Sequence, residues 1–206
     1  MSDYDKVLLE ALSGGTVGGM QNISSLVVLA HLAMQAESLP GDLVEFGCAE
    51  GRTARLLATV STKLVHVYDS FNGLPTKDPL DGNSEQFVEG AIRTLPETVI
   101  ATFEAGGLEP PVIHSGWFCD LTDSDMPEQV AFAFLDCDFY HSMLDALALV
   151  YPKLSPGAAL VVHDYHHHEL PGVKVACDQF MDGKPEKLEP VYGAKGYEVF
   201  RMFYKL

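Results

Sequence analysis

The sequence predicts an α/β fold, a doubly wound and mostly parallel sheet that ends in an antiparallel hairpin. Apolar runs typical of strands alternate with segments of helical periodicity. Acidic or imidazole side chains directly follow several of these runs, and two strand-like runs around a glycine turn close the chain at 191–203. Because helical crossovers join parallel strands and short turns join antiparallel ones, this order of elements indicates that architecture.

The elements can be placed along the chain by their periodicity. A helix precedes the first strand and ends at Pro40 and Gly41. The run at 130–135 is apolar throughout, as in a strand buried on both faces. A strand is expected to end at 43–44, further strands are expected at 64–69, 130–135 and 158–162, and a strand that passes into a loop is expected within 112–118. Helices are expected at 24–36, at 53–57 as the first turns of a helix, at 86–104 with an interruption at Pro96, at 142–154 and at 174–181.

Length and composition indicate one domain of ordinary size. The chain has 206 residues, of which 47% are hydrophobic, enough to bury a core. We divide it into an N-terminal arm and helix at 1–40, glycine-rich at 13–20, and a folded domain at 41–206.

The net charge and the spacing of the cysteines limit the classes of binding partner and the cellular compartment that we expect. A net charge of −16 without a run of Lys or Arg argues against nucleic acid or an anionic membrane surface, and favours a small molecule or a metal ion. No apolar run approaches the roughly 18 residues that span a bilayer. The four cysteines are widely spaced and no secretory leader is recognisable, so we expect reduced thiols in a cytoplasmic protein.

The stretch 41–53 combines a strand end, a glycine turn and a helix that includes Thr53. Such a turn presents backbone N–H groups to a ligand, and Gly47 and Gly51 would allow a close approach. Its E-x-G-x-x-x-G spacing matches neither dinucleotide sites nor phosphate loops. Glu45 would repel a pyrophosphate but suit a cation such as the sulfonium of S-adenosylmethionine. The alternative is an ordinary turn with a solvent-exposed Glu45.

Asp69 ends the second strand, about twenty residues after the glycine turn. In an open α/β sheet, a carboxylate at this place accepts hydrogen bonds from the ribose of a bound nucleoside. Asp69 is therefore a candidate ribose acceptor, with a solvated turn residue as the alternative.

Three acids and a histidine follow the fourth and fifth strands. Asp136 and Asp138 would point the same way if strand geometry persists, and Asp164 arrives from the adjacent strand. Crowded carboxylates repel one another, and a divalent cation would remove that cost. Oxygen ligands favour Mg²⁺, whereas ligation by His163 would favour Mn²⁺, Fe²⁺, Co²⁺ or Zn²⁺. Alternatively, these acids cap helices or hold loops.

Four histidines lie close together after the fifth strand. Three consecutive side chains cannot all face one ion, so we expect at most one or two of them to function. His163 is a candidate general base, whereas His167 and His168 are expected in a solvated loop, and the role of His166 stays open.

Six sequence blocks, in order from Gly41 onward, together resemble the macrocin and mycinamicin O-methyltransferase family. They are G-D-L-V-E-x-G at 41–47, D-S-F-x-G-L-P at 69–75, G-W-F at 116–118, L-D-x-D-x-Y-x-S at 135–142, Y-P-K-L-S-P-G at 151–157 and D-Y at 164–165.

The resemblance implies a Rossmann-like class I methyltransferase with a seven-stranded sheet, whose N-terminal arm can close over the active site as a lid. It implies transfer of a methyl group from S-adenosylmethionine to a hydroxyl of a small molecule, a sugar or a natural-product intermediate. In the family, the residue at Asp136 binds Mg²⁺ and that at Asp138 is the general base. The expected cofactor-binding residues are Glu45, Gly47, Cys48, Gly51, Thr53, Asp69, Ser70, Ser115, Trp117 and Asp136.

One departure from the family pattern concerns the metal. The family has two adjacent acids before a Tyr, whereas this chain has His163, Asp164 and Tyr165. The expected ligands are thus Asp136, Asp164 and His163, with the choice between Mg²⁺ and Mn²⁺ open. The alternatives are a metal-independent methyltransferase with His163 as base, or a non-catalytic or rearrangement protein on the same fold. We also expect a homo-oligomer.

Overall fold

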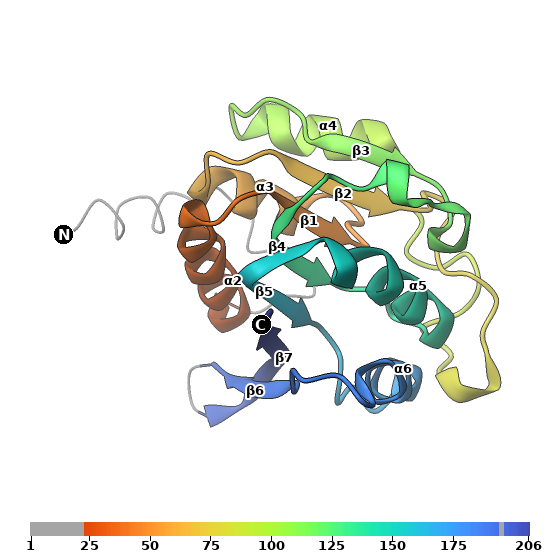
Figure 1. Ribbon diagram of the computed structural model, residues 1–206. Coiled ribbons are helices and arrows are strands. Elements are labelled where there is room, and N and C mark those ends of the chain that lie inside the picture. The colour runs from red at the N-terminus through yellow and green to blue at the C-terminus, as the bar shows by residue number, and fades with distance from the viewer. Residues whose placement is uncertain (1–22, 194–195) are drawn as a thin grey trace.

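The computed structural model describes residues 23–193 and 196–206, which form three layers, a sheet between two groups of helices (Figure 1). The arm at 1–20 and its role as a lid lie outside the described residues. Helices α2, α3 and α4 cover one face of the sheet, and α5 and α6 cover the other (Figure 1). The helices are α2 Ile23–Gln35, α3 Arg52–Val60, α4 Pro96–Ala105, α5 Tyr140–Val150 and α6 Pro171–Met181.

The sheet has seven strands in the order β3-β2-β1-β4-β5-β7-β6. The first five are parallel, and β7 runs antiparallel between β5 and β6, so the predicted doubly wound sheet with its terminal hairpin is confirmed. Strand order reverses between β1 and β4, where open α/β sheets bind their ligands. The strands are β1 Asp42–Phe46, β2 Val65–Asp69, β3 Val112–Ser115, β4 Val130–Leu135, β5 Leu154–Val162, β6 Glu189–Tyr192 and β7 Glu198–Tyr204.

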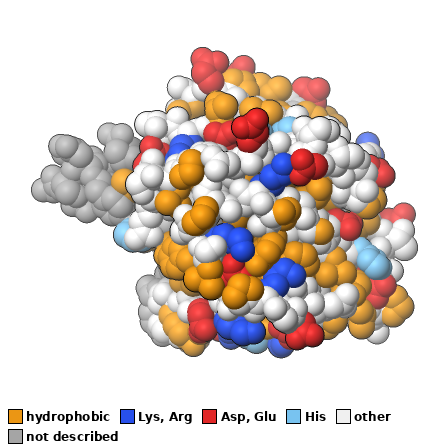
Figure 2. All heavy atoms as spheres, viewed as in Figure 1, with side chains coloured by type: hydrophobic (Ala, Val, Ile, Leu, Met, Phe, Trp, Pro, Cys, Tyr) orange, Lys and Arg blue, Asp and Glu red, His pale blue; other side chains and the backbone are white. Residues whose placement is uncertain are grey.

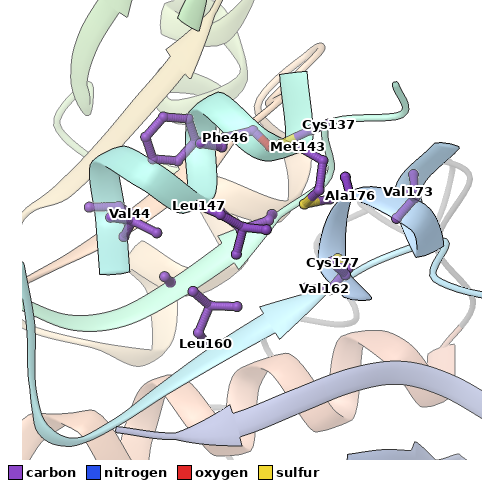
Figure 3. Packing of buried hydrophobic residues seen from close by; sticks show 14 of the residues in the cluster. Val44, Phe46, Cys137, Met143, Leu147, Leu160, Val162, Val173, Ala176 and Cys177 are labelled. Carbon is purple, nitrogen blue, oxygen red and sulfur yellow. Dashed lines mark hydrogen bonds between the residues drawn. The ribbon is translucent and has the colours of Figure 1, made fainter. Parts of the chain in front are cut away.

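Two apolar cores hold the layers together. One lies between the sheet and α5 and α6, and Figure 3 shows side chains from β1, α5, β5 and α6 meeting in it. The other lies under α2, α3 and α4. All six residues of β4 are buried, as its apolar sequence predicted. Because both faces of β4 are covered, only its carboxyl end is available to a ligand.

Several predicted boundaries were wrong. The helix expected at 86–104 begins only at Pro96, because proline fits the first turn of a helix and breaks its interior. The expected helix at 142–154 begins earlier, at Tyr140, and ends at Val150. β5 then begins at Leu154, and Pro156 lies in an irregular stretch between its pairings with β4 at Leu154 and Ala159.

One face of the molecule carries a mixture of charged and apolar side chains. On the face seen in Figure 2, Lys and Arg side chains lie scattered among apolar and acidic ones. Within the described part of the chain, none of the helices combines the length and the apolar character that crossing a bilayer requires.

Candidate active site

A pocket opens at the carboxyl ends of β1, β2 and β4, beside the reversal of strand order. Its empty space, which includes the part open to the solvent, is about 630 Å³. Six residues that the sequence singled out line it: Gly47, Asp69, Ser70, Trp117, Asp136 and Asp138.

The other expected cofactor residues are placed around the pocket and are not among those lining it. Cys48 is buried beneath the turn, and Thr53 is buried in the first turn of α3. Ser115 ends β3 and is exposed. The five expected cofactor-binding residues that do not line the pocket are Glu45, Cys48, Gly51, Thr53 and Ser115.

The glycines of the turn are required by the packing of the chain itself. Gly47 and Gly51 have φ of +81° and +74°, a region that disfavours residues with a Cβ. A Cβ on Gly47 would lie 2.0 Å from the carbonyl oxygen of Asp136, and one on Gly51 would lie 2.8 Å from Cγ1 of Val99. The sequence predicted that a ligand approaches these glycines closely. In the fold, Asp136, directly after β4, and Val99 of α4 already lie against them.

Asp69 holds the glycine turn from the end of β2. Its Oδ2 accepts the backbone N–H groups of Cys48 and Ala49 at 3.0 and 3.1 Å, and its Oδ1 accepts that of Phe71 at 2.9 Å. A carboxylate oxygen has two lone pairs, so Oδ1 keeps one for a ligand. This structural role was not predicted, because it depends on how the turn folds back over β2.

Glu45 is buried, with 1% of its surface exposed, so the alternative of a solvent-exposed side chain is wrong. Its Oε2 has no hydrogen-bond partner among the described residues. Burial, followed by the negative charges of Asp136 and Asp69, raises the pKa of Glu45 well above its usual value. The carboxyl therefore adds to the negative potential under the turn only when a cation nearby favours its ionised form.

Asp136, His163 and Asp164 meet at the ends of β4 and β5. One ligand atom from each lies within 4.8 Å of the others. Nδ1 of His163 is 2.8 Å from Oδ1 of Asp136 and 3.0 Å from Oδ2 of Asp164. Burial alone would lower the pKa of His163, but the two carboxylates raise it well above its usual value.

The donor set of this cluster fits a divalent cation. Two carboxylates and an imidazole suit Mn²⁺, Fe²⁺, Co²⁺ or Zn²⁺ better than Mg²⁺, which prefers oxygen ligands. The same separations of 2.8 and 3.0 Å also suit charge-assisted hydrogen bonds from a protonated His163. The cluster can thus be held together by a metal or by the imidazolium.

Asp138 reaches the pocket through an unusual backbone. β4 ends at Leu135, so the strand alternation expected to align Asp138 with Asp136 does not continue. Instead, Asp138 has a φ of +60°, and Asp164 a φ of +58°. Such conformations cost about 1–3 kcal/mol in residues other than glycine and gather at functional sites.

The carboxyl of Asp138 is the least satisfied polar group of the pocket. Only 9% of the residue is exposed, and its Oδ1 has no hydrogen-bond partner among the residues described. Burial and then the charges of Asp136 and Asp164 raise its pKa well above its usual value. A buried acceptor without a partner costs free energy, which a ligand hydroxyl would recover.

The histidine tract divides among three environments. His166 lies 3.1 Å from a guanidinium nitrogen of Arg201. His167, expected in a solvated loop, is instead half-buried against the ring of Phe87, with ring centroids 5.6 Å apart. His168 is exposed and stacks on His167. Only His163 is part of the cluster at the strand ends.

Sequence reasoning missed Asp81. This buried carboxylate accepts the backbone N–H groups of Tyr140 and Asp78 at 2.6 and 2.8 Å. A Cβ on Gly172 would lie 2.0 Å from its Oδ1, so Asp81 fits against the starts of both α5 and α6. The D-P-x-D spacing at 78–81 is a capping box that could have revealed the turn.

Sequence reasoning also missed half of the pocket wall. Ile92 has a φ of +59°, which is rare for a β-branched residue. The hydroxyl of Thr94 donates to the carbonyl of Ala49 at 2.9 Å and ties this segment to the glycine turn. The added wall residues are Ala49, Gly73, Leu74, Pro75, Ile92, Phe118, Cys137 and Ser142.

Comparison with known proteins agrees with this geometry. A mycinamicin III 3''-O-methyltransferase from Micromonospora griseorubida is 30% identical over 182 residues, 81% of this chain and 70% of that protein. A tetracenomycin-type rhamnosyl 4'-O-methyltransferase from Streptomyces olivaceus is 30% identical over 163 residues, 73% of this chain. This chain spans 62% of the length of the Streptomyces olivaceus relative.

Solved structures share the fold. The O-methyltransferase NovP superposes with a TM-score of 0.76 at 25% identity, covering 91% of this chain and 81% of NovP. The calicheamicin methyltransferase CalS11, at 16% identity and a TM-score of 0.70, covers 99% of this chain and shows the fold alone. The expected Rossmann-like class I methyltransferase fold is thus confirmed. The family model described as macrocin-O-methyltransferase (TylF) matches residues 12–191, so the chain belongs to the macrocin O-methyltransferase family.

Proposed function

We propose that this protein transfers a methyl group from S-adenosylmethionine to a hydroxyl of a glycosylated natural product or its sugar precursor. Two relatives with 30% identity carry the names of O-methyltransferases that act on such compounds. The single observation that carries the proposal is the buried Oδ1 of Asp138, which has no hydrogen-bond partner in the described part of the chain, in a pocket at the strand-order reversal. A hydroxyl donor is the partner this oxygen lacks.

The glycine-turn side of the pocket suits the cofactor. Asp69 has one lone pair left for a ribose hydroxyl, and Trp117 offers a ring beside it. The carboxylates of Asp69 and Asp136 give the pocket a negative potential that favours a sulfonium. Glu45, which does not line the pocket, strengthens that potential when the bound sulfonium favours its ionised form.

The β4 side of the pocket suits the acceptor. Asp138 accepts the proton of the acceptor hydroxyl as its oxygen attacks the sulfonium methyl carbon. The bond from carbon to sulfur breaks, and the sulfur keeps the electron pair as a neutral thioether. The left-handed backbone of Asp138 fixes its carboxyl in place before substrate arrives, which supplies positioning rather than flexibility.

A divalent metal would be held by Asp136, Asp164 and His163. When bound, such a cation supplies Lewis-acid stabilisation of a developing alkoxide. A metal-free variant is the second candidate, favoured by the short separations of His163 Nδ1 from both carboxylates. In that case the imidazolium balances the two acids.

The test is incubation with methyl-labelled S-adenosylmethionine and a panel of sugar, macrolide glycoside, phenol and catechol acceptors, read by product mass. We expect the product to gain one methyl group on a hydroxyl of its sugar unit. Tight cofactor binding with no methylated product would instead favour a non-catalytic protein. A product of unchanged mass would favour a rearrangement.

The metal is tested in the same assay after exhaustive chelation. Loss of turnover that Mn²⁺ restores better than Mg²⁺ is expected from the donor set. Full turnover after chelation would favour the metal-free arrangement.

A further inference from the structure

The turn after β5 is held by side chains that neither line the pocket nor belong to the cluster of Asp136, His163 and Asp164. Tyr165 follows Asp164 directly, and its hydroxyl donates a short hydrogen bond to Asp178 of α6. Lys174 of α6 donates to the same hydroxyl at 3.3 Å. Tyr165 is thus fastened to α6 immediately beyond the left-handed residue of the turn.

β7 also contacts the Tyr165 ring. The guanidinium carbon of Arg201 lies 5.1 Å from the centre of that ring, within the range of a cation–π contact. Arg201 also donates to Glu198 at 2.8 Å and to the carbonyl of Leu188 at 3.2 Å, so its position is fixed. The ring is therefore held between α6 and β7 by charged groups of both elements.

The next residues of β7 and of the turn are also in contact. The ring of Phe200 lies 5.7 Å from that of His163, measured between centroids. The backbone N–H of His167 donates to the carbonyl of Asp164 at 2.9 Å and closes the turn. Contacts on both sides of Asp164 therefore maintain its φ of +58°.

We propose that Tyr165, held by Asp178, Lys174 and Arg201, is a positioning residue that fixes the turn of His163 and Asp164 for methyl transfer. We name these four residues the Tyr165 clamp. This inference rests on the proposed function, because it assigns the turn a part in turnover. Without the clamp, the left-handed backbone of Asp164 would relax toward commoner conformations, and its carboxylate would move from His163 Nδ1.

The test compares Tyr165→Phe, which removes the hydroxyl and keeps the ring, with Tyr197→Phe, a control at a tyrosine that is 72% exposed. For Tyr165→Phe we expect kcat to fall about tenfold, because small misplacements at a reacting centre are costly. The Kd of S-adenosylhomocysteine should stay within about twofold of wild type, since the glycine turn is untouched. Tyr197→Phe should match wild type in both.

A second variant examines the clamp as a unit. Asp178→Ala, which removes the acceptor of the Tyr165 hydroxyl, should lower kcat by a similar factor, and the double variant should lower it little further, because both changes break one interaction. Fully multiplicative losses would overturn the coupling between Tyr165 and Asp178.

Hydrogen–deuterium exchange gives a readout that does not depend on turnover. Tyr165→Phe should speed exchange in a peptide covering 163–170 and leave one covering 46–53 unchanged. Unchanged kcat, or faster exchange throughout the protein, would overturn the proposal. If wild-type protein methylates no acceptor, the proposed function fails, and the exchange result alone then decides whether Tyr165 holds the turn.

Discussion

The two sides of the pocket are built in opposite ways. On the glycine-turn side, Asp69 accepts three backbone N–H groups, and the turn fits against β4 so closely that Gly47 has no room for a Cβ. On the β4 side, Asp138 is buried with a left-handed backbone, and its Oδ1 has no hydrogen-bond partner within residues 23–193 and 196–206. Satisfied groups make a rigid scaffold, whereas an unsatisfied acid stores free energy that a substrate can release. We infer that the first side binds the cofactor and the second performs the chemistry.

The largest expected effect follows from Asp138→Asn, which keeps the shape of the side chain and removes its basicity. Turnover should fall about 10²- to 10⁴-fold, the usual contribution of a general base. Calorimetry should show nearly unchanged binding of S-adenosylhomocysteine. The control is Asp182→Asn at an exposed acid. Near-normal turnover of Asp138→Asn would show that the base is another group.

A substitution on the glycine-turn side should lower the stability of the fold rather than turnover. Gly47→Ala places a Cβ 2.0 Å from a backbone oxygen at a φ of +81°, and we expect a loss of about 3 kcal/mol in the free energy of unfolding from strain and overpacking. Gly90 has a φ of +77°, and no atom of the described residues lies within 4 Å of a Cβ there, so Gly90→Ala should cost only about 1 kcal/mol. Urea denaturation measures both, and equal losses would contradict the packing explanation.

Asp69→Ala should act on cofactor binding more than on chemistry. Removing the acceptor of three N–H groups loosens the turn and would delete the proposed ribose contact, so the Kd of S-adenosylhomocysteine should rise about tenfold, or 1.4 kcal/mol. With saturating S-adenosylmethionine, turnover should change less than it does in Asp138→Asn. A variant that binds the cofactor normally but does not turn over would reverse the assignment of the two sides.

The smallest expected effect concerns Glu186, a buried acid with several hydrogen-bond partners that does not line the pocket. Lys205, Tyr151 and the N–H of Leu206 hold Glu186, and although burial opposes them, its pKa is lowered to about 2 from 4.5. Because the folded pKa is depressed, Glu186 stabilises the fold above pH 4.5, and this contribution is lost as the pH falls toward 2. Glu186→Gln should reduce the acid sensitivity of unfolding by about 1 kcal/mol, allowing for solvent screening. An unchanged acid transition would show that Glu186 contributes nothing to it.

Sequence patterns predicted the architecture well because each strand and helix carries its own periodicity. The apolar run of β4 and the acids that follow it could be read directly, and both Asp136 and Asp138 line the pocket. The reason expected for their alignment was wrong, however, since the chain leaves strand geometry at Asp136. The left-handed turn at Asp138 depends on tertiary packing, which no local pattern encodes.

The remaining misses have the same origin. Nothing in the sequence marks Ile92 as a pocket residue, because its side chain is directed there by a conformation that β-branched residues rarely adopt. The helical periodicity at 86–95 was misleading, because Pro96 favours the start of a helix over its interior. Asp81 could have been recognised as a cap, but not as the residue that joins two helix starts.

A crystal structure of the protein with S-adenosylhomocysteine and a methylatable glycoside would test the central claim most directly. The account predicts the cofactor sulfur between the glycine turn and Asp136, and the acceptor hydroxyl within about 3.2 Å of the Asp138 carboxyl. A hydroxyl held elsewhere, with Asp138 facing only protein atoms, would contradict it.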